Sequence, residues 1–567
     1  MPNVWAIKRL FPFLYWRRPT LATLRRDAWA GLSVGLVLIP QALAYATLAG
    51  MPPETGLYAA LLPAVIGILW GSSALLAVGP VALTSLLTFG SLAPLAAPGS
   101  AHWVVLAMWL ALYAGMIQFA IGALRLGEIA SLVSQPVVLG FINAAAIIIV
   151  VSQLPALLGI TLTFSLAYPL LAVQLTPATV MTSVLGAASL LLLFMLKRIT
   201  PRLPGMLIVS ALAIFVSWLT GYAVHGGAIV GPVSAGLLPL AVPPAISFAE
   251  HQSLWPAALV LALISFTEAM SSCRVLARKT GERWDVNQEL IGQGLAKIAS
   301  GFSGAFPVSG SFSRSALNLY AGAVSAWATL FSALCVLLSL FYLTGLIAYL
   351  PRAVLASMII LPVLSLIDFG ALRRLVLLSK DDGAIAIATF AVTLVTAPRL
   401  QWGVFVGVGL SLLSFLYRRT HPRIVEVGIH QDETFRDRSR FTLPLISNEL
   451  LAVRIDSALN FLTVSCFERF VTDRCKQNPE IKKVLFCAGS VNDIDASGID
   501  MLIALQQGLE RDGIALYMCA VKKQVWEVMA RSPFVDALGI ERVFTTDKQA
   551  MHVLQALPAC VIFNSAE

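Results

Sequence analysis

The sequence predicts an all-α polytopic membrane protein that continues into a C-terminal α/β domain. Of its 567 residues, 58% are hydrophobic and 12% are charged, about half the charged share of a soluble globular domain. The mean hydropathy is +0.82. Apolar runs long enough to span a bilayer follow one another up to about residue 420, and beyond that point charged residues recur every few positions. The chain is therefore expected to change from a lipid to an aqueous environment there.

Residues 1–27 are basic and aromatic, and they lack a short apolar run followed by a small-residue cleavage site. We interpret them as a cytosolic N-terminal arm and not as a signal peptide. The net charge of +9 is compatible with a nucleic-acid partner. However, the basic residues cluster beside apolar stretches, which favours anchoring at the membrane surface and no nucleic acid.

The next boundaries follow from composition: a membrane domain at 28–420, a polar linker at 421–440 and a soluble domain at 441–567. Lys and Arg in short loops indicate orientation, because they favour the cytoplasmic side. If all such clusters face the cytosol, both chain ends are cytoplasmic, and segments 159–176 and 223–253 lie outside. Hydropathy alone gives roughly ten to twelve crossings of a cell (inner) membrane. The clusters are Arg17, Arg18, Arg25, Arg26; Arg125; Lys197, Arg198, Arg202; Arg274, Arg278, Lys279, Arg283; Arg373, Arg374, Lys380; and Arg418, Arg419, Arg423.

Two segments, 77–85 and 304–315, are rich in Gly, Pro and Ser and interrupt the apolar runs. Both are typical of extended backbone leading into a short half-helix, with Pro80 suited to a first helical turn. Helix N-termini carry partial positive charge and free N–H groups, so two of them facing a cavity form an anion site. Their matching positions in two halves, the second counted from about residue 254, indicate an inverted repeat. The alternative is a pair of loops at the membrane surface.

Two charged residues fall inside apolar surroundings. Arg314 follows the second break, where exposure to lipid would cost at least ~2.5–3.5 kcal/mol, so we expect a partner or a substrate anion beside it. The alternative is an arginine that extends to the membrane surface. Glu268 lies in the apolar segment 261–270, where a carboxylate is a candidate relay for H⁺ or Na⁺. Competition between an anion and Glu268 for Arg314 would couple anion binding to the binding of H⁺ or Na⁺. The alternative is a static ion pair between Glu268 and Arg314.

Three polar or small-residue features complete this part. Gln41 follows the helix-breaking Pro40 and has an amide that can donate to an oxyanion, with Tyr45 one turn further along. A purely structural amide fits Gln41 equally well. The Gly403-x3-Gly407 spacing favours close helix packing.

Together these motifs resemble the sulfate permease (SulP) family, equivalent to animal solute carrier family twenty-six, over nearly the whole chain. The resemblance implies fourteen transmembrane segments in two inverted repeats of seven, divided into core and gate domains. It also implies that the third and tenth segments are half-helices meeting at the substrate, and that the protein forms homodimers. The motifs are residues 39–46, 53–63 reaching 71–73, 78–80, 306–307 and 313–315.

Carried over by position, the resemblance places Gln41 and Tyr45 on the first segment and Val81 and Ala82 on the third. It places Glu268 on the eighth and Ser313 and Arg314 on the tenth.

The chain departs from the family pattern at two positions, where Thr55 replaces a common tyrosine and Ala74 a common basic residue. Members with the carboxylate resemble proton- or sodium-coupled symporters, whereas members with the arginine are often exchangers. This chain has both residues, so symport and exchange both remain open.

The soluble part alternates strand and helix patterns, which indicates an α/β domain. We expect strands at 449–459, 481–488 and 514–521 and helices at 463–477 and 501–511, the latter ended by Gly513. Asp495-x-Ser497-Gly498 at a helix start resembles the STAS domain (sulfate transporter and anti-sigma antagonist), in which the equivalent serine is phosphorylated. Ser497 is thus a candidate regulatory switch whose phosphate the helix N-terminus would stabilise, and a cytosolic STAS-binding protein is a candidate partner. The alternative is that Asp495 and Ser497 only cap the helix.

The function expected from all this is secondary active transport of a small anion (sulfate, bicarbonate or a dicarboxylate), coupled to H⁺ or Na⁺. An uncoupled exchanger or channel is the nearest alternative, and a membrane-tethered STAS sensor is the alternative from another class. An enzyme is not expected, since the six histidines form no nucleophile–base pair or metal-ligand cluster, and there is no phosphate-cradling loop. No cofactor, metal or disulfide framework is indicated by the seven scattered cysteines.

Overall fold

The computed structural model describes residues 11–16, 18–128, 133–160, 176–199, 204–232, 239–432 and 434–554. The chain divides into two compact units, Met1–Ser411 and Leu412–Glu567. Part of the expected N-terminal arm (residues 1–10 and Arg17), Arg202, Cys560 and most of segment 159–176 lie outside the described residues.

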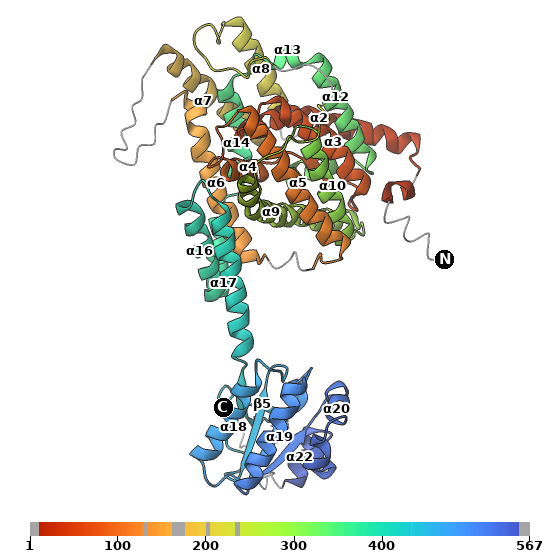
Figure 1. The fold of residues 1–567 in the computed structure, drawn as a ribbon, viewed down its shortest axis with the longest axis vertical. Coiled ribbons are helices and arrows are strands. Elements are labelled where there is room, and N and C mark those ends of the chain that lie inside the picture. Colours follow the sequence, from red (N-terminus) through yellow and green to blue (C-terminus); the bar gives the residue numbers. More distant parts are fainter. Residues whose placement is uncertain are drawn as a thin grey trace. The chain divides into compact units, whose positions relative to one another are not determined.

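The first unit is built from helices, with two very short strands inserted among them (Figure 1). Its main elements are α2 (Leu21–Leu48), α3 (Glu54–Trp70), β1 (Ala77–Gly79), α4 (Ala82–Leu92), α5 (Ala101–Ala123), α6 (Gln135–Leu158), α7 (Pro177–Ile199), α8 (Gly205–Leu219), α9 (Phe248–Thr280), α10 (Val286–Phe302), β2 (Ser309–Ser311), α11 (Phe312–Tyr320), α12 (Trp327–Tyr342), α13 (Thr344–Ile347), α14 (Arg352–Leu364), α15 (Phe369–Leu378), α16 (Lys380–Val395) and the part of α17 (Gln401–Thr420) up to Ser411.

Local chemistry sets where the functional helices begin. Ser247 and Glu250 form a reciprocal capping box at the start of α9, and the Asp285 side chain caps α10. Ser311 caps α11 by accepting the Arg314 N–H. Each cap satisfies a backbone donor that has no partner within its helix.

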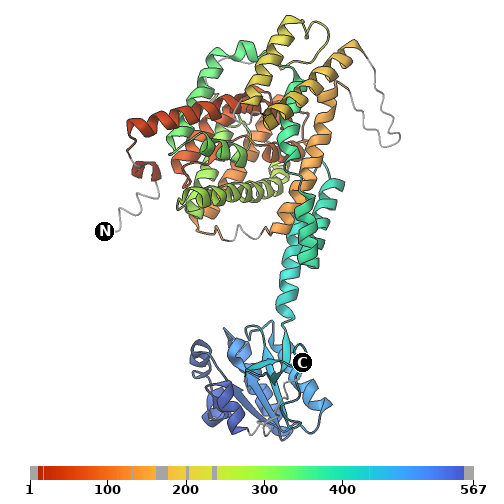
Figure 2. The same cartoon turned by 180° about the vertical axis from the view of Figure 1, so that it is seen from behind.

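The helices of the first unit form two bundles. The core bundle contains α2–α5 and α9–α12, in which α5 packs on α9 and α10, and α12 packs on α2 and α3. The gate bundle contains α6–α8, α14 and α16, in which α6 packs on α14 and α16 (Figures 1 and 2). Contacts of α2 with α8 and α14 join the two bundles.

Six described stretches are long and apolar enough to cross a membrane: α2, α5, α6, α7, α9 and the α14–α15 stretch Arg352–Leu378. Shorter apolar helices, α3, α4, α8 and α12, lie between them. The third helix counted from α2 is α4, and β1 is the element directly before it. The third helix counted from α9 is α11, and β2 is the element directly before it. This correspondence is the one expected of two repeats of seven segments, and the short helices explain why hydropathy alone undercounts the crossings.

Glycines let the helices approach closely. In α17, a side chain at Gly403 or Gly407 would collide with the Thr393 or Thr389 hydroxyl oxygen of α16. The predicted packing role of this glycine pair is therefore confirmed.

The second unit is a six-stranded sheet with strand order β4-β3-β5-β6-β7-β8. Strands β5 to β8 are parallel, and β3 pairs antiparallel with both β4 and β5. Helices α18 and α19 contribute to the apolar cluster on one face, and α22 contributes to the cluster on the other. The elements are β3 (Ile424–Ile429), β4 (Phe435–Asp437), β5 (Leu450–Ile455), α18 (Val464–Gln477), β6 (Lys483–Cys487), α19 (Ala496–Arg511), β7 (Ala515–Cys519), α20 (Lys523–Met529), α21 (Phe534–Leu538), β8 (Val543–Phe544) and α22 (Asp547–Val553).

The strands and helices predicted at 449–521 are confirmed, whereas the linker predicted at 421–440 is wrong. Its residues form β3 and β4, which extend the sheet beside β5. The charged side chains that suggested a linker pair with one another, since Arg438 Nη1 lies 2.8 Å from Glu426 Oε2 and Arg423 pairs with Asp437. An edge of a sheet can carry such charges without being unstructured.

Candidate functional site

The two interrupted segments meet inside the core bundle. Strands β1 and β2 pair antiparallel, with Ala77 opposite Ser311 and Gly79 opposite Ser309. Because α4 begins three residues after β1 and α11 directly follows β2, both half-helix N-termini start from this buried ladder. The prediction of extended segments leading into half-helices is therefore confirmed. Pro80, however, precedes the Val81 cap and does not lie in the first turn of α4.

Arg314 lies in the first turn of α11 and is 2% exposed. Its Nη1 donates to the Pro80 carbonyl oxygen at 2.8 Å, which ties the second break to the first. Its Nε and Nη2 are buried and have no hydrogen-bond partner among the described residues. Arg314 thus retains donors for a ligand, in a region where unpaired donors are costly.

A small cavity lies beside Arg314, between α2, α3, β1, α11 and α12. Three further polar atoms on its lining residues, Asn318 Oδ1, Thr329 Oγ1 and Ser332 Oγ, are buried without a described partner. Its volume of about 10 Å³ corresponds to about one water molecule. This side of the guanidinium can therefore hold a water molecule but not an oxyanion such as sulfate.

Glu268 lies on α9 and is partly exposed, with its Oε2 atom buried and unpartnered among the described residues. Arg314, Lys297 and the Ser309 hydroxyl all interact with its carboxyl group. Ser309 Oγ also donates to the Ser265 carbonyl oxygen at 3.0 Å, which fixes β2 against α9. The structure therefore places Glu268 next to the β1–β2 ladder.

The other predicted residues surround this point in different ways. Tyr45 is buried on α2, near the side chains of Arg314 and Glu268. Val81 and Ala82 are buried at the start of α4, whereas Ser313 is exposed at the start of α11. Gln41 is buried, and its Nε2 contacts the Met206 sulfur at 3.1 Å across to α8. Its Oε1 has no described partner.

Lys297 was not singled out by the sequence analysis. It lies on α10, is fully buried, and donates from Nζ to Gln118 Oε1 of α5 at 2.9 Å. Helices α5 and α10 approach backbone to backbone at Gly115 and Gly294, one turn before Lys297. The sequence did contain a sign of this residue. Lysine is rare in membrane helices, and Lys297 lies one turn after a glycine that allows close helix packing.

Comparison with known proteins agrees with this architecture. The Sulfate permease family model matches residues 24–389, and a STAS domain model matches 444–550. The chain belongs to the sulfate permease family. It is therefore a multi-pass membrane anion transporter and not an enzyme, as the sequence predicted.

Among curated relatives of this family, a probable sulfate transporter of Mycobacterium tuberculosis is 33% identical over 535 residues, covering 92% of this chain and 94% of the relative. The chloroplastic sulfate transporter 4.1 of Arabidopsis thaliana is 30% identical, covering 96% of this chain and 83% of the relative.

Two solved structures share the fold. The murine Solute Carrier 26 family member A9 anion transporter has a TM-score of 0.87 at 21% identity, covering 98% of this chain and 96% of that chain. The transmembrane domain of the cyanobacterial bicarbonate transporter BicA has a TM-score of 0.58 at 22% identity, covering 69% of this chain and 99% of that chain.

In the STAS domain, Ser497 lies in the first turn of α19 and is partly exposed. The cap of α19 is Asp495, whose Oδ1 accepts from the Gly498 N–H at 2.8 Å and whose Oδ2 accepts from the Phe461 N–H at 3.1 Å. The capping part of the alternative interpretation therefore applies to Asp495, whereas Ser497 makes no capping hydrogen bond within the described part of the chain.

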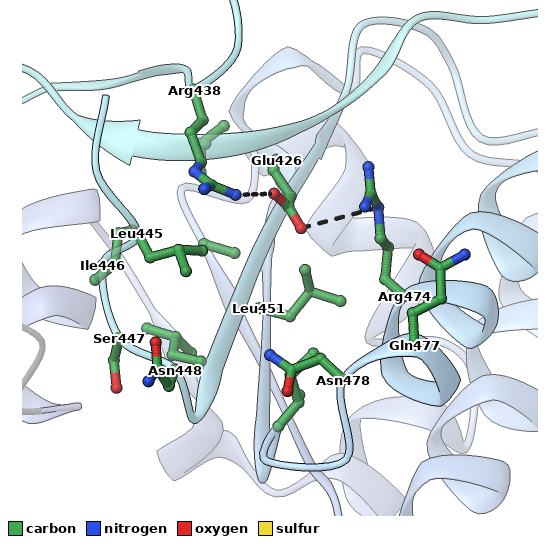
Figure 3. Close-up of a pocket in the computed structure, with 14 residues that line it drawn as sticks. Glu426, Arg438, Leu445, Ile446, Ser447, Asn448, Leu451, Arg474, Gln477 and Asn478 are labelled. Atoms are coloured by element: carbon green, nitrogen blue, oxygen red, sulfur yellow. Dashed lines mark hydrogen bonds and ion pairs between the residues drawn. The ribbon is translucent and has the colours of Figure 1, made fainter. Parts of the chain in front are cut away.

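The STAS domain also has a pocket of about 250 Å³ between β3, β5, the β4–β5 loop and the end of α18. Figure 3 shows Glu426 between Arg438 and Arg474 at this pocket, with contacts of 2.8 Å to Arg438 and 3.9 Å to Arg474. Because Glu426 of β3 pairs with Arg438 just after β4 and lies near Arg474 of α18, we assign this cluster to holding these three elements together.

Proposed function

We propose that this transporter carries small oxyanions, sulfate first among them, by proton- or sodium-coupled symport with alternating access. The single observation that supports the proposal is the β1–β2 ladder, which joins the starts of α4 and α11 beside Arg314 and Glu268. The names of the two curated relatives, both sulfate transporters, agree with the choice of anion.

The anion would be held by groups that favour negative charge. The first N–H groups of α4, at Val81 and Ala82, and that of Ser313 in α11 point out of their helices at the N-terminal ends, whereas the Arg314 N–H is taken by the Ser311 cap. The Ser313 hydroxyl and the free guanidinium nitrogens add charged and neutral donors. Tyr45 and Gln41 would form the wall on α2.

Coupling would come from Glu268. An arriving anion competes with the Glu268 carboxylate for the Arg314 charge, so binding favours a Glu268 that is neutralised by H⁺ or balanced by Na⁺. The core bundle would then carry both past the gate bundle. The Gln41–Met206 contact lies at the boundary between the bundles, so a movement of one bundle against the other would change it.

The test is uptake of labelled sulfate by the purified full-length protein in liposomes, with pH and sodium gradients imposed separately. The proposal expects accumulation that depends on one of the gradients. Uptake that ignores both gradients but needs an internal anion would establish exchange in place of symport. Anion binding without any uptake would favour the membrane-tethered STAS sensor. A thermal-shift series with sulfate, bicarbonate, oxalate, fumarate and chloride identifies the preferred anion.

Variants test the site itself. Arg314→Ala is expected to weaken sulfate binding at least roughly ten-fold, since it removes a charge-assisted hydrogen-bond donor from a buried site. Arg374→Ala is the matched control, because Arg374 is exposed on α15. Equal sulfate affinity in the two variants would contradict the assignment of Arg314.

Three further properties belong to this proposal. We place both chain ends on the cytoplasmic side of an inner membrane, and the protein as a homodimer. Phosphorylation of Ser497 would add negative charge at the start of α19, where the helix N-terminus stabilises it. Cysteine accessibility from each side, cross-linking in membranes and phosphate analysis of the purified protein test these in turn.

A further inference from the structure

Lys297 of α10 is a lysine buried inside the core bundle. Its ammonium group has three donor hydrogens, and Gln118 is its one hydrogen-bond acceptor among the described residues. An ammonium group removed from water with so few partners costs several kilocalories per mole. The fold therefore retains an ionisable group that its own packing does not require.

A hydrogen-bonded chain connects Lys297 to the proposed anion site. The Gln118 amide nitrogen donates to the Ala262 carbonyl oxygen at 2.6 Å and to Ser265 Oγ at 3.0 Å. Ser265 lies one turn before Glu268 on α9, and its carbonyl oxygen accepts from Ser309 of β2. Lys297 also interacts electrostatically with Glu268. Its charge thus acts on the site without an observed contact to the anion position.

The charges around the ladder do not balance. Arg314 on α11 and the protonated form of Lys297 on α10 are cations, and Glu268 on α9 is the carboxyl group on which both charges act. Glu289, also on α10, is engaged elsewhere, since its Oε2 accepts from the Ser72 and Ser73 N–H groups at 2.9 and 3.1 Å. Two cations and an ionised Glu268 leave one positive charge; a protonated Glu268 leaves two.

We propose that Lys297 is a positioning residue that sets the charge of the site so that divalent oxyanions are preferred over monovalent ones. This proposal rests on the proposed function and names its substrate class. With the transported proton on Glu268, the two cations neutralise a dianion such as sulfate. Without the Lys297 charge, only the positive charge of Arg314 remains, which matches a monovalent anion such as nitrate.

The size of the effect follows from Coulomb's law. At a separation on the order of 10 Å and an effective dielectric constant of about 20, one charge changes affinity by roughly ten-fold or somewhat more for each charge on the anion. Loss of the Lys297 charge is therefore expected to reduce the sulfate-to-nitrate affinity ratio by about ten-fold.

The experiment is a thermal-stability titration of the purified full-length protein with sulfate, selenate and nitrate, which needs no transport. Wild-type protein is expected to bind the two dianions at least roughly ten-fold more tightly than nitrate. Lys297→Gln is expected to lose most of that preference, and Lys297→Arg to keep it. Gln118→Asn is the matched control, because it weakens the hydrogen bond but keeps an amide that can accept from the ammonium group, so it is expected to lower stability and keep the preference.

Three results would overturn the proposal: equal affinity of the wild type for sulfate and nitrate, an unchanged ratio in Lys297→Gln, or the same loss in Gln118→Asn. If Lys297→Gln does not fold, Lys297→Met takes its place, because methionine fills the same buried space without a charge or a hydrogen-bond donor. If the wild type binds none of the anions, the proposed function fails first, which separates the two outcomes.

Discussion

Gly79 offers a test of the site that leaves every charge in place. It lies in β1 with φ of +157°, a backbone conformation that residues with a Cβ rarely adopt. A Cβ at this position would lie 3.3 Å from Arg314 Nη2. Gly79→Ala is expected to cost about 1–3 kcal/mol in backbone strain. If the site shifts to relieve this strain, the loss of anion affinity can be no larger than the strain energy. An energy of about 1–3 kcal/mol corresponds to a loss of roughly 5- to 150-fold.

The assay combines thermal unfolding in detergent with sulfate titration and liposome uptake. Gly99→Ala is the matched control, because Gly99 also has positive φ, +77°, but no atom lies within 4 Å of its added Cβ. Both variants are expected to lose stability, about 1–2 kcal/mol for Gly99→Ala, and only Gly79→Ala to lose sulfate affinity. Wild-type affinity and uptake in Gly79→Ala would refute the placement of Arg314 at the anion.

Three other predictions follow from separate parts of the chain. Glu268→Gln is expected to keep sulfate affinity within about three-fold while accumulation loses its dependence on the gradient; liposome uptake with and without a gradient measures this, and unchanged coupling contradicts it. Asp27→Ala is expected to cost about 2–3 kcal/mol, because Asp27 Oδ1 accepts from the Val324 and Ser325 N–H groups at 2.7 and 3.1 Å; thermal unfolding in detergent shows it. In the STAS domain, the Arg440 N–H, the Ser439 hydroxyl and Arg423 lower the pKa of Asp437 to about 2 from 3.8. Its contribution to stability is therefore complete above about pH 4 and lost as the pH falls towards 2. Scanning calorimetry should find this pH dependence reduced in Asp437→Asn.

The sequence predicted more of the site than of its surroundings. Arg314 and Glu268 were recognisable because charges in apolar segments are rare, and the two breaks because Gly and Pro interrupt helices. Pro80 was predicted to lie in the first turn of α4 but precedes the Val81 cap, since a proline fits both an extended segment and a first helical turn. The strands β3 and β4 were mistaken for a linker, because charged side chains on an edge resemble those of a loop.

The amino-acid sequence by itself determined the membrane class, the interrupted helices, the order of domains and the buried charges, because each depends on composition or on neighbours within a few residues. Only the tertiary structure decided that Gly79 pairs with Ser309, that Arg314 reaches the Pro80 carbonyl and that Lys297 meets Gln118. These partners lie far apart along the chain, and no local pattern specifies which of many buried polar groups will meet. Packing decides it, since a donor buried in the core must find an acceptor wherever the helices bring one.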